Sequence, residues 1–406
     1  MELRPIISAL NRSKTGAALI TCQIAITLAI LANAFFVIAQ RLELTTRPSG
    51  VDEKNIFVIV NDRLKARADG GSSVKADLAV LRGLPGVQNA YASNTAPLWG
   101  GGTGFAFTLH PGQKQDVVLA SVYFGDERTV NTLGLKLMAG HNVTDVVEWR
   151  DVTDKPPISG ILVTKAMADQ LTPGGDVVGK VVTILNTNQT APIVGVVRQL
   201  QGPFVTAKGI FGSFEDSSVI VPYLPVSDLC LYVVRAQSNR VSALMKLAQD
   251  RLYAVDGARL ISGVHSLPEL RREAYREYRG LAIMLGAVCL ILLAVSAFGI
   301  IGLTSYWVSR RRRQIGIRRA LGATRVAIMR YFMTENLIIT ITGTILGSGI
   351  AVAGNVWMVE SFSMTRLPRQ YLVLGAIAML VLGQLAVLWP ALRAASVPPA
   401  LATRNV

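Results

Sequence analysis

Residues 15–40 read TGAALITCQIAITLAILANAFFVIAQ and contain no Asp, Glu, Lys or Arg. Three further stretches share this property, at residues 280–309, 336–359 and 370–392. Each exceeds the roughly 20 residues that a helix needs to cross about 30 Å of hydrocarbon. Residues 15–40 are also too long and too bulky for the apolar region of a signal peptide. The sequence therefore predicts four transmembrane helices.

The positive charge of the chain lies at the ends of these stretches. The net charge is +15, of which residues 310–335 carry +7 and residues 41–279 only +3. Short loops rich in Lys and Arg stay in the cytoplasm, whereas long domains are translocated largely regardless of charge. We therefore predict that residues 310–335 and both termini lie inside and that the large segment lies outside. This pattern differs from the basic face of a nucleic-acid-binding domain, so we predict no nucleic-acid partner.

These two patterns give a predicted order of segments. With 51% hydrophobic residues, the composition is that of a chain partly surrounded by lipid. We expect a multi-pass protein of the cytoplasmic (inner) membrane. The predicted segments are a cytoplasmic N-terminus (1–14), transmembrane helix 1 (15–40), an extracytoplasmic domain (41–265), a stalk helix continuous with transmembrane helix 2 (266–309), a cytoplasmic loop (310–335), transmembrane helix 3 (336–359), a short outer loop (360–369), transmembrane helix 4 (370–392) and a cytoplasmic tail (393–406).

The outer domain has the pattern of a mixed α/β fold. Two β-α-β units are predicted far apart in the sequence, which indicates one split subdomain with a mostly β subdomain inserted between its halves. Cys230 is the one cysteine of this domain, so an apolar core must hold it together without an internal disulfide. The first unit covers residues 55–60, 72–84 and 87–92, and the second covers residues 229–235, 241–253 and 259–264. Strand-like runs of the insert lie at residues 116–123, 160–164, 180–185, 193–197 and 219–223.

Residues 266–269 read Ser-Leu-Pro-Glu and predict the start of a helix. A Ser followed three residues later by a Glu is the capping-box pattern, and Pro suits the first helical turn. No helix breaker follows up to Ser309. We therefore predict one continuous helix that runs from the outer domain through the second span.

The cytoplasmic loop reads RRRRQIGIRRALGAT at residues 310–324. Gly322 suits the left-handed residue that ends a helix, and Thr324 can cap the next one, so two helices are predicted to meet at a tight corner. Ala320, Leu321 and Ala323 would then form a small apolar knob ringed by arginines. A loop that only sets topology and binds anionic lipid needs the charge but not the knob. The combination favours a surface that docks on another protein.

This loop resembles that of the MacB/FtsX-like family of ABC transporter permeases, which carries an Arg-rich pattern followed by Ile-Gly-Ile-Arg-Arg-Ala-Leu-Gly-Ala-Ser/Thr. The chain is similar to that family over nearly its whole length, including the position of the large domain after the first span. The other similar motifs are LPGV (84–87), LGLKLMAG (133–140), TPGGDVVGK (172–180), VGVV (194–197) and WPALRAASVPPAL (389–401).

The resemblance implies a permease subunit that performs no catalysis itself. A cytoplasmic ATPase would dock on the loop, and ATP hydrolysis would move the outer domain to export or extrude a substrate. No catalytic, cofactor-binding or metal-binding residue is predicted on this chain, and ATP and Mg²⁺ belong to the ATPase. With 14 residues before the first span and 14 after the last, we expect the ATPase to be a separate polypeptide. The residues expected to couple to it are Arg318, Arg319, Ala320, Leu321, Gly322, Ala323 and Thr324.

The third span and the family resemblance also bear on partners other than the ATPase. Gly343, Gly347 and Ala351 recur every four residues in the third span, the small-residue pattern that lets two helices approach closely. The pattern fits packing within the four-helix bundle as well as a dimer interface. We expect a dimer with a second copy or with a related permease, surrounded by membrane lipids. The resemblance leaves open whether a periplasmic adaptor and an outer-membrane channel take part.

Three alternatives concern a nucleotide-binding site, a metal site and a signalling function. Gly174, Gly179 and Lys180 have the spacing of a phosphate-binding P-loop, but Val181 stands where a Ser or Thr would ligand Mg²⁺. The three histidines, at positions 110, 141 and 265, form no metal-binding pattern. The alternative function is a membrane signalling or scaffold protein whose outer domain senses a ligand or activates a cell-wall hydrolase. A neighbouring ATPase gene would favour the transporter.

Overall fold

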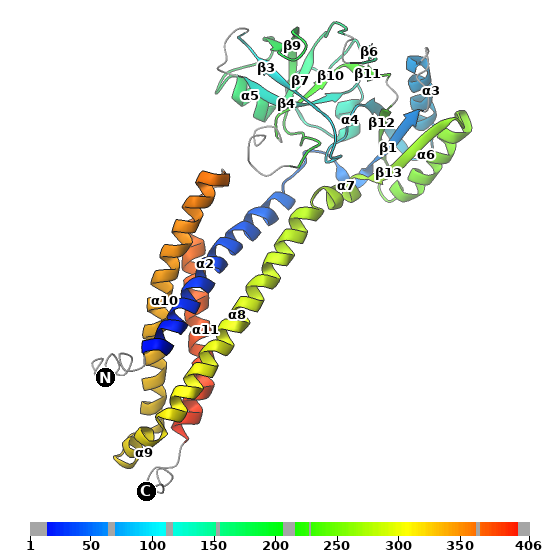
Figure 1. Cartoon of the computed structure of the whole chain (residues 1–406). Helices are drawn as coiled ribbons and strands as arrows, with labels where there is room; N and C mark the ends of the chain where they lie inside the picture. Colours follow the sequence, from blue (N-terminus) through cyan, green and yellow to red (C-terminus); the bar gives the residue numbers. More distant parts are fainter. Residues whose placement is uncertain are drawn as a thin grey trace. The chain divides into compact units, whose positions relative to one another are not determined.

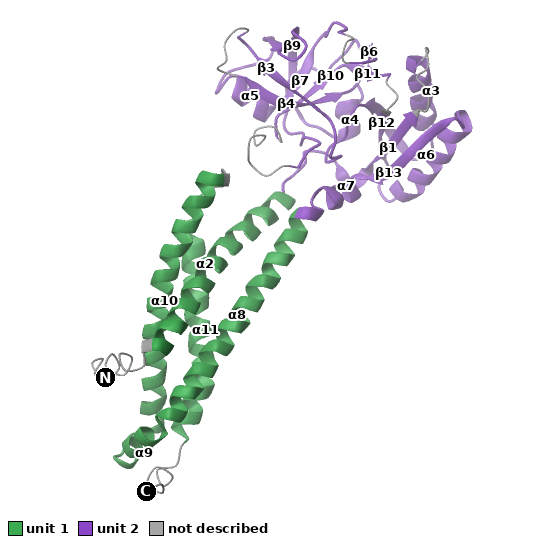
Figure 2. Ribbon diagram, viewed as in Figure 1, with its two compact units in different colours: residues 1–45, 278–406 green, residues 46–277 purple. Residues whose placement is uncertain are grey.

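Figure 1 shows the computed structural model of the chain, which describes residues 14–63, 70–110, 117–151, 155–205, 216–226, 229–362 and 366–396. The chain divides into two compact units, which Figure 2 distinguishes by colour. The helical unit consists of residues 1–45 and 278–406, and the mixed unit consists of residues 46–277.

Within the described residues, the helical unit contains four helices that are long and apolar enough to cross a membrane. α2 covers Lys14–Thr45, α8 covers Arg276–Arg310, α10 covers Arg325–Phe362 and α11 covers Arg369–Ala395. The short helix α9, Arg312–Ala320, follows α8 directly. Each long helix contains one of the charge-free stretches, so the prediction of four transmembrane helices is confirmed.

Polar side chains inside the helical unit connect neighbouring helices. Thr27 of α2 and Ser296 of α8 share a buried hydrogen bond of 2.9 Å. Asn336 of α10 donates to the carbonyl oxygen of Gly383 on α11 at 2.9 Å. A buried polar group in an apolar surrounding costs free energy unless it finds such a partner. These bonds therefore fix which helix faces lie against each other.

The mixed unit contains a four-stranded antiparallel sheet in the order β13-β1-β12-β2. Helices α3 (Gly70–Arg82) and α6 (Val241–Val255) pack against one face of this sheet. The strands that neighbour one another come from both ends of the domain, which confirms the predicted split subdomain. The bounds are Ile56–Arg63 for β1, Val87–Ser93 for β2, Leu229–Ala236 for β12 and Arg259–Ser266 for β13.

Strand β1 shows why residues 56–60, which read IFVIV, are apolar at every position. Phe57 and Ile59 pack with the side chains of α3 and α6, whereas Ile56 and Val58 pack on the opposite face. That second face lies against residues of the inserted subdomain, among them Tyr123 and Leu162. Because side chains alternate along a strand, a sheet that is covered on both sides needs apolar residues throughout.

The insert between β2 and β12 is a mostly β subdomain, as predicted. Its seven-stranded sheet has the order β5-β9-β7-β10-β4-β3-β8, and β8 also pairs with β9. Strands β6 and β11 form a separate pair. The sequence did not indicate β3, β5, β6, α4 or α5. The bounds are Thr103–Thr108 for β3, Val118–Phe124 for β4, Leu137–Gly140 for β5, Val147–Trp149 for β6, Ile161–Thr164 for β7, Val181–Ile184 for β8, Gln189–Val197 for β9, Ser218–Val221 for β10, Tyr223–Pro225 for β11, Thr129–Leu133 for α4 and Lys165–Leu171 for α5.

The stalk differs from the continuous helix that the sequence predicted. The capping box is present, because Ser266 accepts from the backbone N–H of Glu269 and the Glu269 carboxylate accepts from the backbone N–H of Ser266. The helix that it starts, α7, ends at Ala274, and α8 begins at Arg276. Tyr275 between them has φ −100° and ψ 8°, outside the helical region. The prediction of one uninterrupted helix is therefore wrong.

Candidate functional site

The corner between α9 and α10 ends one helix and starts the next within four residues. The backbone N–H of Gly322 donates to the carbonyl oxygen of Arg319 and that of Ala323 to the carbonyl oxygen of Arg318. These are the two hydrogen bonds of a Schellman motif, and Gly322 occupies its left-handed position with φ +96°. The Thr324 hydroxyl accepts from the backbone N–H of Ala327 at 3.2 Å. Both predicted roles, for Gly322 and for Thr324, are confirmed.

Helix α9 is attached to the spans on its inner side. Arg311, just before α9, donates to both carboxylate oxygens of Glu335 on α10 at 3.0 and 2.9 Å, and the Glu335 side chain is 2% exposed. Ile315 of α9 is buried in the same apolar cluster as Ile328 and Phe332 of α10. Because these contacts are buried, α9 packs as part of the helical unit.

The outer side of the corner exposes an apolar surface. Leu321 is 83% exposed, and Ile317, one turn earlier, is 47% exposed. Val326 on the first turn of α10 is 50% exposed. We call Ile317, Leu321 and Val326 the corner patch. The predicted knob contained only Leu321 of these three, although the spacing of Ile317 and Leu321 by four residues was a readable signal.

The predicted coupling residues divide into two groups in the structure. Ala320, Leu321, Gly322 and Thr324 are exposed, and Ala323 is half-buried. Arg318 is also exposed, whereas Arg319 is half-buried, and both arginines contact other parts of the helical unit.

Arg318 and Arg319 contact other parts of the helical unit. The Arg318 guanidinium lies 5.0 Å from the centre of the Tyr331 ring on α10. Arg319 donates from Nη1 to the carbonyl oxygen of Ala395 near the end of α11 at 2.8 Å. Arg319 therefore links α9 to α11, a structural contact that the prediction of a docking role did not include.

The small residues of α10 face α2. A Cβ added to Gly343 would lie 2.8 Å from Ile24 Cγ2, and one added to Gly347 would lie 2.7 Å from the carbonyl oxygen of Ala25. Ala351 is 1% exposed, and its carbonyl oxygen accepts from Asn33. These three positions are covered by α2 of the same chain. They therefore pack within the bundle, which is one of the two alternatives that the sequence left open.

The chain enters and leaves the mixed unit beside one cluster of polar contacts, which we call the base cluster (Arg47, Glu53, Gln201, Arg271 and Tyr275). Arg271 of α7 donates to both carboxylate oxygens of Glu53 at 2.8 and 2.7 Å and to the carbonyl oxygen of Arg47 at 3.0 Å. Gln201 donates from Nε2 to the buried hydroxyl of Tyr275 at 2.8 Å. The segment after α2 and the segment before α8 are thus bonded to each other.

The charges at the base are stabilised by these bonds. Burial opposes the charge of Arg271, but its hydrogen bonds to Glu53 outweigh that cost and raise the pKa of the guanidinium. At the start of α7, the backbone N–H of Ser266 bonds to the Glu269 carboxylate and lowers the pKa of that group. Both groups are therefore charged at neutral pH.

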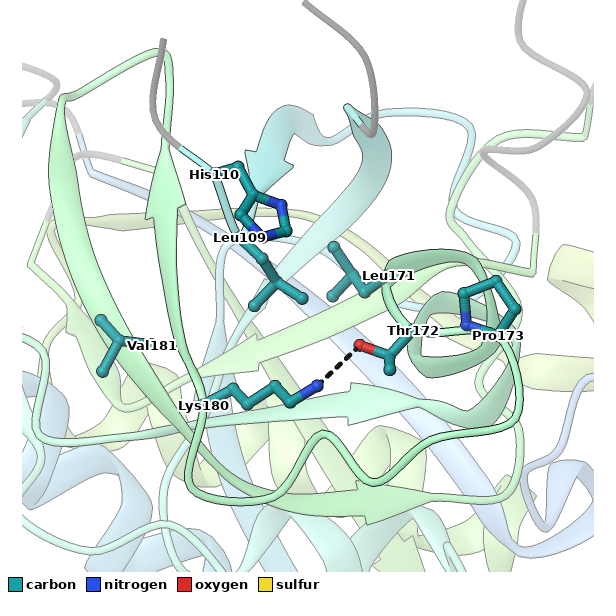
Figure 3. A pocket seen from close by; sticks show the side chains of 7 residues that line it. All are labelled: Leu109, His110, Leu171, Thr172, Pro173, Lys180 and Val181. Carbon is teal, nitrogen blue, oxygen red and sulfur yellow. Dashed lines mark hydrogen bonds between the residues drawn. The ribbon is translucent and has the colours of Figure 1, made fainter. Parts of the chain in front are cut away.

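The P-loop-like segment lies in the mixed unit beside a hollow of about 450 Å³. Lys180 Nζ points toward the Thr172 hydroxyl at 3.3 Å, as Figure 3 shows. The lysine is followed by strand β8, and Val181 is 52% exposed. In a P-loop the lysine begins a helix whose N-terminus binds the phosphates. The segment is therefore a turn between α5 and β8. Among the described residues, no group of three His, Cys, Asp or Glu side chains could hold a metal ion.

Two family models match the chain over most of its length. The MacB-like periplasmic core domain matches residues 20–252, and the FtsX-like permease C-terminal domain matches residues 286–399. The chain belongs to the MacB/FtsX-like family of ABC transporter permeases. It is therefore an integral membrane protein with a MacB-like α/β domain.

Curated relatives of this permease include chains with and without ATP-binding in their names. It is 24% identical to the macrolide export ATP-binding/permease protein MacB of Neisseria gonorrhoeae over 64% of its own length and 39% of MacB. It is 22% identical to the uncharacterized ABC transporter permease YknZ of Bacillus subtilis over 81% of its own length and 78% of YknZ. A pyoverdine export ATP-binding/permease protein PvdT of Pseudomonas entomophila is 31% identical over 48% of this chain and 31% of PvdT. The permease spans about two fifths of the MacB proteins that it matches.

Two solved structures are similar to part of the chain. The periplasmic region of MacB from Actinobacillus actinomycetemcomitans is 14% identical, with a TM-score of 0.35, over 57% of this chain and 97% of that chain. The extracellular domain of YknZ is 15% identical, with a TM-score of 0.33, over 51% of this chain and 100% of that chain.

Proposed function

We propose that this permease couples ATP hydrolysis by a separate cytoplasmic ATPase subunit to movement of residues 46–277, and that this movement exports a substrate. The observation that carries the proposal is the corner patch, an exposed apolar surface on a helix that is itself fixed to the spans. A loop that only binds anionic headgroups requires positive charge but no leucine that is 83% exposed at its apex. Binding to a groove on a partner protein would bury this leucine, and burying one leucine contributes roughly 1.5–3 kcal/mol.

The corner can transmit a displacement because it is attached on two sides. The Arg311–Glu335 ion pair joins it to α10, and the bond from Arg319 to Ala395 joins it to α11. A partner that pushes the corner therefore acts on two spans at once. In the mixed unit, the base cluster bonds α7 to residues 47–53. We propose that movement of α8 reaches the mixed unit through this cluster.

The names of the relatives support export as the direction of transport. MacB proteins are named for macrolide export and PvdT proteins for pyoverdine export, whereas YknZ carries no substrate in its name. The named substrates differ between relatives that resemble this permease to a similar degree. The proposal therefore specifies export and an ATPase partner without a substrate class.

Site-specific photocrosslinking tests the proposal. A photoreactive phenylalanine analogue is placed at Leu321, and, as a matched control, at Leu260 of β13, an exposed leucine of the mixed unit. After irradiation of intact cells, the chain is purified and its crosslinked partners are identified by mass spectrometry. We expect an ABC ATPase subunit from position 321 and none from position 260. Crosslinks from position 321 to lipid alone, or to a kinase or hydrolase, would contradict the proposed coupling.

A further inference from the structure

Two spans end on the same arrangement of an aromatic ring and an arginine four residues later. The last residues of α8 read YWVSR (306–310), and the corresponding part of α11 reads WPALR (389–393). The Arg310 guanidinium carbon lies 5.3 Å from the centre of the Tyr306 ring, and that of Arg393 lies 5.4 Å from the centre of the Trp389 ring. Residues at i and i+4 share a helix face, so each arginine stacks over its own ring.

Both pairs lie on the outside of the helical unit at the same end. Tyr306 is 51% exposed, Trp389 is 58% exposed, and both arginines are exposed. Helix α9 begins two residues after Arg310, and its Arg319 bonds to Ala395, two residues after Arg393. Figure 1 shows the ends of α8 and α11 beside α9. The two pairs therefore lie at the same end of the helical unit, beside α9.

Arg310 and Arg393 differ from Arg311 in the groups that they bind. Arg311 binds Glu335, whereas in the described part of the chain no carboxylate forms an ion pair with Arg310 or Arg393. A guanidinium has five N–H donors in a planar fork that matches phosphate oxygens. Stacking on the ring leaves the edge of that fork, with its donors, open to an anion.

We propose that each pair binds the phosphate group of an acidic phospholipid. Tyr and Trp rings favour the headgroup level of a bilayer, so the ring holds the arginine at the depth of the phosphates. Acidic lipids attract arginines near the membrane surface, and stacking adds cation–π attraction. The simpler role of an arginine at a helix C-terminus is to offset the helix dipole, which requires neither the ring nor a lipid. This inference requires only that α8 and α11 span the membrane and is independent of the ATPase.

Native mass spectrometry of the full-length chain in detergent tests the proposal. The probe lipids are dioleoyl phosphatidylglycerol and, with the same acyl chains, dioleoyl phosphatidylcholine. We expect two preferred phosphatidylglycerol sites, and we expect Arg310→Gln and Arg393→Gln each to weaken one of them about fivefold. The matched control is Arg313→Gln, which removes the same single charge from an exposed arginine of α9.

Ring variants separate the proposal from charge effects. Tyr306→Leu and Trp389→Leu keep both arginines and are expected to weaken phosphatidylglycerol binding while the circular dichroism spectrum stays that of the unmodified chain. Unchanged binding in the ring variants would leave only the helix dipole role and overturn the proposal. An equal loss in the α9 control would show a general basic surface, and displacement of the lipid by millimolar inorganic phosphate would show that the headgroup alone is bound; either result would also overturn it.

Discussion

The two ends of α8 are built in different ways. At one end, α7 leads into it, and Arg271 and Tyr275 are bonded to residues 47–53 and to Gln201 of the mixed unit. At the other end, α9 leads out of it, and beyond the Arg311–Glu335 pair the chain exposes Leu321. At the α7 end, the polar side chains find hydrogen-bond partners within the chain. At the α9 end, an apolar side chain is exposed. In the proposed function, α8 therefore connects the mixed unit to the surface that we propose as the docking site of the ATPase.

The largest expected effect comes from breaking the buried ion pair behind the corner. Arg311→Gln leaves the Glu335 carboxylate, 2% exposed, without its cation. Removing one partner of a buried pair costs about 3 kcal/mol or more. We expect a clear loss of thermal stability in detergent, measured by intrinsic fluorescence. Adding Glu335→Gln to the same chain should restore most of it, and Arg312→Gln should have little effect. A single variant as stable as the unmodified chain would show that α9 is not held by this pair.

A smaller effect is expected at the base cluster. Arg271→Gln removes the two bonds to Glu53, and hydrogen bonds between charged groups contribute about 1.5–3 kcal/mol each before solvent exposure reduces them. Because both side chains are about one fifth exposed, we expect a loss of about 2 kcal/mol in the unfolding of the mixed unit. In a reconstituted complex, ATP hydrolysis should continue while export declines. The exposed neighbour gives the control Arg272→Gln, and equal export by both variants would contradict transmission through the cluster.

The turn of the corner allows a test of backbone geometry alone. No atom lies within 4 Å of a Cβ added to Gly322, so Gly322→Ala creates no clash. Its φ of +96° still costs an L-residue about 1–2 kcal/mol. We expect a modest fall in melting temperature, whereas Gly302→Ala in the middle of α8, where a Cβ also meets nothing, should be neutral or slightly stabilising. Equal behaviour of the two variants would show that the corner tolerates another backbone path.

The smallest effect is a pH dependence at the start of α7. The backbone bond from Ser266 lowers the pKa of Glu269 below the ordinary value of 4.5. A group whose pKa is lower in the folded state adds stability above its unfolded pKa and loses it as the pH falls through the folded value. Urea unfolding at pH 7 and at pH 3.5 should therefore show a larger loss for the unmodified chain than for Glu269→Gln. Parallel losses would mean that the capping box does not depend on the charge.

The sequence predicted the corner because the contacts that shape it are local. Gly322 and Thr324 act on atoms within four residues of themselves, so their residue types are sufficient evidence. The four spans and the split subdomain follow from charge-free runs and from repeated β-α-β patterns. These features depend on the periodicity and length of continuous segments.

The base cluster could not be predicted for the opposite reason. Arg271 and Glu53 lie 218 residues apart, and Gln201 and Tyr275 lie 74 residues apart. Tyrosine is not a helix breaker, so nothing local indicates the interruption at Tyr275. Likewise, Gly343 and Gly347 predict a close helix contact, but their spacing does not identify α2 as the neighbour.

Co-purification of the ATPase with Leu321→Asp measures the central claim most directly. At a buried contact, Leu321→Asp removes the burial of one leucine and adds the burial of an unpaired carboxylate. Together these two costs weaken binding by more than about 3 kcal/mol, or two orders of magnitude in affinity. The control is Leu260→Asp, an equally drastic change at an exposed leucine of the mixed unit. With both variants at the unmodified level in the membrane, we predict that Leu321→Asp loses the ATPase and Leu260→Asp retains it. Retention of the ATPase by Leu321→Asp would contradict the assignment of the corner as its docking surface.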